Sequence, residues 1–406
     1  MRLAREYDQL LIAGGVLLTA LGVTMIYSAA SGSALWWSQT GHALFALVVA
    51  AAIVQVPDKL FYGLAYAFHG VSLLTLVAVL AWGTGDPARW LTVGGMTFQP
   101  AEFTKVTTVM ALARYLGDIR SEHLLRPQAF LVSLAICAAP MALVAKQPDL
   151  GTAVAFGAPL FPMLYWAGMR PLHIFYITAP LLSIVFSFEP LWQGDAAIVF
   201  ALFILASSVA IQLLQGRLWL TLTLLAVNLS AGLIAVYGWV DLLRDYQKAR
   251  ILTFLNPERD TLGAGWNIIQ SKIAIGSGGL LGKGYLEGTQ TKYEFLPAAH
   301  TDFIFSVIGE ELGFVGVVAV LALFFFLIWR ALSIGTMANN RFYGLLAIGL
   351  AATLTFHVFV NVGMTIGVMP VTGLPLPFLS YGGSALLTNW MAVGLLLHAF
   401  ANRHEY

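Results

Sequence analysis

The chain has 406 residues, of which 59% are hydrophobic and only 10% are charged, and its mean hydropathy is +0.81. This composition excludes a soluble globular protein and is typical of an integral membrane protein. A formal net charge of +1 without dense basic clusters excludes nucleic-acid binding. The single cysteine, Cys137, lies in an apolar run, which excludes disulfides and thiolate metal sites.

Apolar stretches long enough to cross a bilayer recur along the whole chain. The first exceeds the length of a typical signal-peptide core, so we interpret it as an uncleaved span. The predicted spans are 9–30, 39–57, 60–82, 101–117, 127–146, 151–168, 171–188, 195–214, 218–240, 302–329, 342–366 and 383–401. The sequence therefore predicts an all-α polytopic membrane protein with about twelve transmembrane helices in a single domain, 1–406.

The positive charges predict how these spans are oriented. If the N-terminus is cytoplasmic, the inner loops hold many cations, among them Lys59, Arg120 and Arg170, and the short outer connections hold chiefly Arg89. Lys and Arg in short loops mark the cytoplasmic side of a membrane protein. We therefore expect both termini to be cytoplasmic.

Three outer segments, 83–103, 241–301 and 361–384, interrupt the apolar pattern. Irregular backbone near membrane depth is tolerated where protein or a water-filled cavity satisfies its amides, so these segments are expected to roof one cavity. The second is far longer than a normal connection. Within it, near-helical apolar spacing predicts a short helix over Trp266–Ile275. This helix either lies in the membrane interface with Lys272 toward the headgroups or packs on the bundle.

Asp302 lies where the long loop meets the next predicted span, and carboxylates at such a boundary are costly enough to suggest function. Partial burial, or proximity to Glu294, Glu310 or Glu311, would raise its pKa toward that of a useful general base. Capping of the following helix is the structural alternative. His300-Thr301-Asp302 is not a hydrolytic triad, because no serine nucleophile elbow accompanies it.

Other polar residues allow both structural and functional interpretations. Glu102 and Lys105 are three positions apart and share a helix face, either as an ion pair or as a site. Asp149 either caps the sixth span or contacts a substrate. The glycine-rich stretch 276–284 fails the phosphate-loop spacing, so we interpret it as a flexible glycine turn.

Together these motifs resemble one family closely, the shape, elongation, division and sporulation (SEDS) membrane proteins. The matching stretches run in the expected order from residue 83 to the C-terminus. They are Arg89-Trp90-Leu91, Gln99-Pro100 with Glu102, Gln147 through Thr152, Tyr246-Gln247, Arg250-Ile251, Gln270 through Gly279, Gly288-Thr289-Gln290, Phe295-Leu296-Pro297, His300 through Phe305, Pro370 through Gly373 and Pro375 through Ser384. The short N-terminus and Gly288-Thr289-Gln290 favour the elongation branch of the family over its division branch.

The resemblance implies a peptidoglycan glycosyltransferase of the bacterial cytoplasmic membrane, which polymerises lipid II at the outer face during cell elongation and releases undecaprenyl pyrophosphate. By the family's motifs Asp302 is the general base and Glu294 a second catalytic residue, and both are candidate ligands for a divalent Mg or Mn ion. The implied substrate-binding residues are Arg89, Glu102, Lys105, Asp149, Lys272 and Ser380. The implied partners are a class B penicillin-binding protein, which is a transpeptidase, and other elongation-complex proteins.

The chain departs from the family in a few places. The family usually has ten spans, so a two-helix insertion is predicted within 171–240, and the loop 241–301 stays outside with its short interfacial helices. Ala101 and Ala298 replace the family's usual Ser and Glu. Three alternatives stay open, namely a lipid II flippase without chemistry, a scaffold for the transpeptidase, and a division polymerase. The position of the polar loop residues on one side favours a polymerase over a flippase, which needs polar groups at midplane and on both faces.

Overall fold

The computed structural model describes residues 7–30, 33–85, 87–124, 126–192, 194–242, 248, 252–259 and 264–403. The chain divides into two compact units, Met1–Gly168 with Asn267–Tyr406, and Met169–Trp266. Each unit is described by itself. The family motifs Tyr246-Gln247 and Arg250-Ile251 lie outside the described residues.

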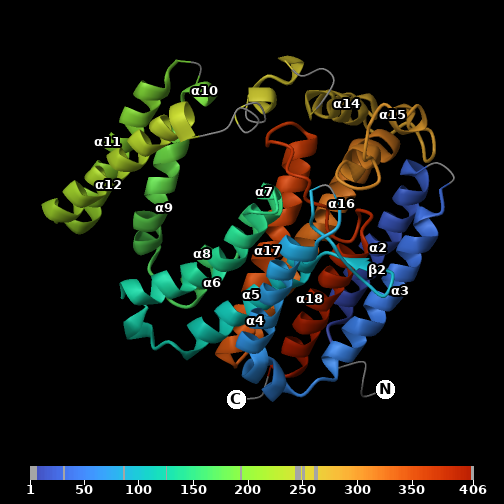
Figure 1. Ribbon diagram of the computed structural model, residues 1–406, viewed down its shortest axis with the longest axis horizontal. Helices are drawn as coiled ribbons and strands as arrows, with labels where there is room; N and C mark the ends of the chain where they lie inside the picture. The colour runs from blue at the N-terminus through green and yellow to red at the C-terminus, as the bar shows by residue number, and fades with distance from the viewer. Residues whose placement is uncertain are drawn as a thin grey trace. The chain divides into compact units, whose positions relative to one another are not determined.

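The first unit is a helical bundle with α17 and α18 at its centre (Figure 1). α17 packs on α5, α8 and α16, while α18 packs on α3. These two helices are much more buried than the others that are long and apolar enough to cross a membrane. The helices of the unit are α2 (Gln9–Ala29), α3 (Leu35–Val54), α4 (Asp58–Trp82), α5 (Pro100–Asp118), α6 (Pro127–Ala145), α7 (Leu150–Ala155), α8 (Leu160–Trp166), most of α14 (Ala264–Ser277), α15 (Thr289–Lys292), α16 (Ile304–Met337), α17 (Arg341–Thr365) and α18 (Gly383–Ala401).

The second unit is built from three apolar helices, α9 (Pro171–Phe186), α11 (Ala196–Gln215) and α12 (Leu218–Tyr237), which pack on one another. Ala179, Ile211 and Leu224 form its buried centre. Short elements complete the unit, namely α10 (Glu189–Trp192), a π turn (Gly238–Leu242) and a 3-10 turn (Pro257–Arg259). α11 and α12 occupy two of the predicted spans, and their origin as an inserted pair stays a prediction.

Every predicted span holds a helical segment in the structure. Nine of the described helices are long and apolar enough to cross a membrane, and two shorter apolar stretches, Leu150–Trp166 and Pro171–Phe186, fill two more predicted spans. The twelfth, α5, is less apolar because it carries four charged residues, Glu102, Lys105, Arg114 and Asp118. The polytopic all-α fold class is thus confirmed.

A small β-hairpin, which the fold-class prediction did not include, joins α4 to α5. Strand β1 (Leu91–Val93) pairs antiparallel with β2 (Met96–Phe98). Gly94 and Gly95 form the turn with φ of 59° and 83°, which is the left-handed backbone that favours glycine in two-residue hairpins. The hairpin starts two residues after Arg89 and ends just before α5, so it fixes the approach of both to the bundle.

α16 is interrupted at Gly313, whose φ of 64° and ψ of −165° are non-helical. Residues 279–284 fill the break. The amides of Phe314 and Val315 donate to the carbonyl oxygens of Gly279 (2.9 Å) and Leu280 (3.1 Å). In return, Lys283 N donates to Glu310 O (3.0 Å) and Gly284 N to Glu311 O (3.1 Å). The prediction of a flexible glycine turn is therefore wrong, because this segment replaces the hydrogen bonds that the helix loses.

Candidate functional site

Asp302 lies two residues before α16, and its backbone is held from α17. The side-chain amide of Asn361 donates to Asp302 O (3.0 Å) and to Leu374 O (2.8 Å). The N-cap of α16 is Phe303, and no side chain caps this helix. The helix-capping alternative for Asp302 is thus contradicted, and its carboxylate stays available for other contacts.

The residues before Asp302 are clamped to the segment that precedes α18. The Ser380 hydroxyl donates to Thr301 O (2.6 Å) and accepts from Leu376 N (2.8 Å), and Tyr381 N donates to His300 O (2.9 Å). Ser380, predicted to bind substrate, therefore uses its only proton within the protein. The His300 ring stacks edge-on against Tyr381, and burial lowers the pKa of His300.

Asp149 and Arg89 form the second part of the site. Asp149 caps α7 through Thr152, whose N–H lies 3.2 Å from Oδ1 and whose hydroxyl lies 3.0 Å from Oδ2. The predicted cap is thus confirmed. Arg89 Nη1 lies 3.7 Å from Asp149 Oδ2, and Nη2 donates to Pro148 O (2.7 Å). Arg89 therefore links the hairpin to the start of α7.

Thr372 packs against the start of α7, and the next residue, Gly373, packs against Asp302. A Cβ added at Gly151 would lie 2.4 Å from Thr372 O, and one added at Gly373 would lie 3.6 Å from Asp302 Oδ2. Burial first, and then the negative charge of Asp149, raise the pKa of Asp302 to about 6, while the positive charge of Arg89 opposes the rise. The predicted rise in pKa is thus present, but the neighbouring carboxylate is Asp149.

Glu310 and Glu311 anchor the loop beyond the break in α16 and not the residues around Asp302. Glu310 Oε1 accepts from Lys283 Nζ (2.6 Å) and from Thr289 N (2.9 Å), and Glu311 accepts from the Ser28 hydroxyl. Both carboxylates are buried on α16. They anchor the loop beyond the helix break, so the prediction that they raise the pKa of Asp302 is wrong.

Among the described residues, no hydrogen bond or ion pair joins the side chain of Glu294 or Lys272 to Asp302, Asp149 or Arg89. Glu294 is exposed in a turn with φ of 56°. Lys272 is exposed on α14, with its ammonium group over Gly367. Ser271 of the same helix is buried and bonds Ser306 (2.6 Å) and Thr365 O (2.6 Å). The predicted helix is thus confirmed, and it packs on the bundle through this face.

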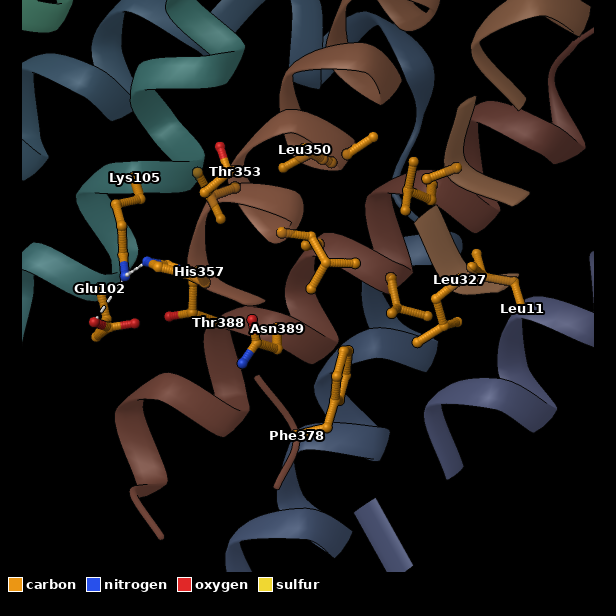
Figure 2. A pocket seen from close by; sticks show the side chains of 17 residues that line it. Leu11, Glu102, Lys105, Leu327, Leu350, Thr353, His357, Phe378, Thr388 and Asn389 are labelled. Carbon is orange, nitrogen blue, oxygen red and sulfur yellow. Dashed lines mark hydrogen bonds and ion pairs between the residues drawn. The ribbon is translucent and has the colours of Figure 1, made fainter. Parts of the chain in front are cut away.

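Glu102 and Lys105 form a second cluster, inside the bundle. Both are almost fully buried on α5, and Lys105 Nζ lies 2.8 Å from Glu102 Oε1. Lys105 Nζ also lies 3.1 Å from His357 Nε2 on α17. All three line a cavity of about 40 Å³. Figure 2 shows them at one end of the cavity, with Leu11 and Leu327 at the other.

Sequence reasoning did not find His357 and Asn361, although a signal existed. Thr353, His357, Asn361 and Thr365 recur every four residues along the otherwise apolar α17. Residues at this spacing lie on one helix face. His357 meets Lys105 and Asn361 meets the backbone of Asp302, so the polar stripe of α17 contacts both clusters.

Comparison with known proteins decides the family. The model of the cell cycle protein family that comprises FtsW, RodA and SpoVE matches residues 8–195 and 189–405. The chain belongs to this family. It is 37% identical to peptidoglycan glycosyltransferase RodA of Treponema pallidum, over 97% of both chains. It is also 37% identical to peptidoglycan glycosyltransferase MrdB of Escherichia coli, over 89% of this chain and 85% of the other.

Solved structures of the FtsW/RodA/SpoVE family share the fold. One, from work on the structural coordination of polymerization and crosslinking by a peptidoglycan synthase complex, has a TM-score of 0.74 at 29% identity and covers 98% of this chain and 99% of the other. The crystal structure of Thermus thermophilus rod shape determining protein RodA has a TM-score of 0.64 at 26% identity, with 98% of both chains covered. The chain is therefore a multi-pass membrane protein of this family.

In the part of the chain that the structure describes, the side chains around Asp302 do not make up the donor set of a resident metal. Among the described residues no group of three or more His, Cys, Asp or Glu side chains is placed to hold an ion. Asp149 and Asp302 supply two carboxylates, and Arg89 already brings a positive charge to them. The predicted Mg or Mn site of Asp302 with Glu294 does not fit this arrangement.

Proposed function

We propose that this protein is a peptidoglycan glycosyltransferase of the RodA type that polymerises lipid II in cell elongation. The observation that carries the proposal is the half-buried Asp302, whose raised pKa suits a general base, beside Arg89 and Asp149. The relatives from Treponema pallidum and Escherichia coli are named peptidoglycan glycosyltransferases, which supports the same reaction class.

In the proposed reaction Asp302 acts on the acceptor sugar. Its carboxylate takes the proton of the acceptor hydroxyl while that oxygen attacks the anomeric carbon of the donor. The bond from this carbon to the diphosphate breaks, and undecaprenyl pyrophosphate leaves with the electron pair. A single displacement of this kind inverts the anomeric carbon and needs one base. Asp149 serves by keeping the pKa of Asp302 high enough to accept a proton.

The leaving diphosphate gains negative charge, so a fixed cation should stabilise it. Among the described residues, Arg89 is the cation that acts on both Asp149 and Asp302. Its guanidinium is partly exposed and held by Pro148 O and Asp149. We assign it to the diphosphate. Lys105 is held inside the bundle, where it binds Glu102 and His357.

The orientation and the partner belong to the same proposal. The positive charges of the loops support a cytoplasmic position for both termini and an outer position for the Asp302 end of the bundle. The structural neighbour from a peptidoglycan synthase complex suggests that this polymerase, too, works with a crosslinking enzyme. A class B penicillin-binding protein is the partner that we propose.

One observation favours a second candidate, a flippase for the same lipid. Glu102, Lys105 and His357 are buried polar residues that line a cavity inside the bundle, and such groups also mark transport pathways. The cavity of about 40 Å³ has room for water molecules but not for a lipid headgroup. Its size therefore favours the polymerase over the flippase.

The deciding experiment uses the purified protein in detergent with labelled lipid II, with and without a class B penicillin-binding protein. We expect a ladder of glycan strands on a gel. A folded protein that makes no polymer in either mixture, yet moves lipid II across the bilayer of proteoliposomes, would establish the flippase instead.

Substitutions of Arg89 and Asp149, the two charged neighbours of Asp302, should shift the acid midpoint of the polymerisation rate in opposite directions. The wild-type rate should fall as the pH drops through about 6, because the carboxylate form is the base. Arg89→Gln removes the charge that lowers the pKa of Asp302, so the acid midpoint should move to higher pH. Asp149→Asn removes the charge that raises it and keeps a good helix cap, so the midpoint should move to lower pH.

The measurement is the rate of polymer formation from pH 4.5 to 8 for the three proteins at saturating lipid II, a range chosen around the pKa near 6. Midpoints that move in the same direction, or stay in place, would contradict the role of Asp302 as the titrating base.

A further inference from the structure

The ammonium group of Lys105 is buried among helices and is held by two acceptors. Only 3% of the residue is exposed. Its Nζ lies 2.8 Å from Glu102 Oε1 on the same helix and 3.1 Å from His357 Nε2 on α17. The carboxylate of Glu102 balances the charge, while the imidazole adds only a hydrogen bond. Figure 2 shows the two nitrogens facing each other across the gap between α5 and α17.

The chemistry of the pair fixes the state of the imidazole. A lysine ammonium group has three donors and no acceptor, so His357 must accept at Nε2 and carry its single proton on Nδ1. His357 is itself 5% exposed, which makes a second positive charge at this distance from Lys105 very unfavourable. The ring is thus a neutral acceptor in the described arrangement.

The position of His357 on α17 connects the two clusters. Asn361 follows one turn later on the same face and holds Asp302 O and Leu374 O. The register of α17 against α5 therefore sets both where Lys105 points and where the backbone of Asp302 lies. Thr388 of α18 lies beside the same cavity, and its buried hydroxyl has no partner among the described residues. The cavity therefore contains a polar group that water can satisfy.

We propose that His357 is a positioning residue for the polymerase reaction, which aims Lys105 into the cavity and holds α17 in register with α5. This role rests on the proposed function. Without the acceptor, the ammonium group has only Glu102 to bind and can turn away from the cavity. Polymerisation should then lose kcat, while KM for lipid II should change little, because His357 is buried inside the bundle.

The test compares two substitutions at one position. His357→Gln places a carbonyl oxygen near the original Nε2, whereas His357→Leu fills a similar volume without an acceptor. We expect the Leu variant to lose about 10-fold to 100-fold in kcat, as for other hydrogen bonds to charged groups. The Gln variant should stay within about threefold of wild type. Thr355→Val is the control, since Thr355 is exposed on α17 and, among the described residues, donates to Ala351 O of its own helix (2.8 Å).

Equal losses in the Gln and Leu variants, or an unchanged Leu variant, would overturn the proposal. A loss confined to KM would overturn it too.

A second measurement does not depend on the enzymatic activity. Thermal unfolding in detergent of Lys105→Met, His357→Leu and the double variant forms a mutant cycle, and residues in direct contact should give non-additive shifts of Tm. Additive shifts would show that the pair does not interact. If the Tm shifts of the variants are non-additive but the wild-type protein makes no polymer, the contact between Lys105 and His357 stands and the proposed function is overturned instead.

Discussion

Asp302→Asn is expected to lower the rate of lipid II polymerisation by about two to four orders of magnitude, which is the usual contribution of a general base. Asparagine has nearly the same shape but cannot accept the proton of the acceptor hydroxyl. The backbone of Asp302 is fixed by Asn361, and the side chain caps no helix, so the fold should tolerate the change. The measurement is the initial rate of glycan formation with the purified variant.

Glu287→Gln is the matched control for Asp302→Asn. Glu287 belongs to the loop that leads to Asp302, but its side chain is exposed and lies 3.9 Å from exposed Lys292. Exposed ion pairs contribute little, so neither rate nor stability should change measurably. A normal rate for Asp302→Asn, with the control also normal, would show that another group takes the proton.

Gly313→Ala is expected to lower the thermal stability of the protein and to loosen the loop before Asp302. A Cβ at this position would lie 2.2 Å from Gly282 N and 2.7 Å from Leu281 C, which are backbone atoms that cannot turn away. The φ of 64° and ψ of −165° are also a conformation that side chains rarely adopt. Overpacking of this kind costs about 1–3 kcal/mol, to which the backbone strain adds.

The effect of Gly313→Ala should be measured as Tm in detergent together with proteolysis of the loop 278–290. Gly276→Ala is the control, because Gly276 lies in α14 and a Cβ there meets nothing within 4 Å. Alanine favours a helix more than glycine does, so this control should be neutral or slightly stabilising. Equal Tm values for the two variants would mean that the segment 279–284 is not held in the break.

The glycine-rich segment 276–284 shows why composition alone predicted a flexible turn wrongly. Its composition is that of a flexible turn, and its spacing fails the phosphate-loop pattern. In the structure a Cβ at Gly278 would lie 2.0 Å from Gly309 O, and one at Gly282 would lie 2.0 Å from Glu311 O. The glycines are needed for close approach to another helix, and the identity of that helix is not encoded in the segment itself.

The sequence by itself determined the membrane class, the helical spans and the family, and it singled out Asp302 as the candidate base. These properties depend on local hydropathy, on charge near the ends of spans and on motifs that are contiguous in the chain. The cap at Asp149 and the pair of Glu102 with Lys105 were predictable for the same reason, since each joins residues three positions apart.

Only the tertiary structure decided which carboxylates share a site. Glu294 is eight residues from Asp302 yet exposed, whereas Asp149 is far away in sequence and raises the pKa of Asp302. The contacts of His357 with Lys105 and of Asn361 with Asp302 likewise join α17 to distant segments. Such pairs depend on how helices pack, because a buried polar group finds its partner on whichever neighbour lies within hydrogen-bond distance.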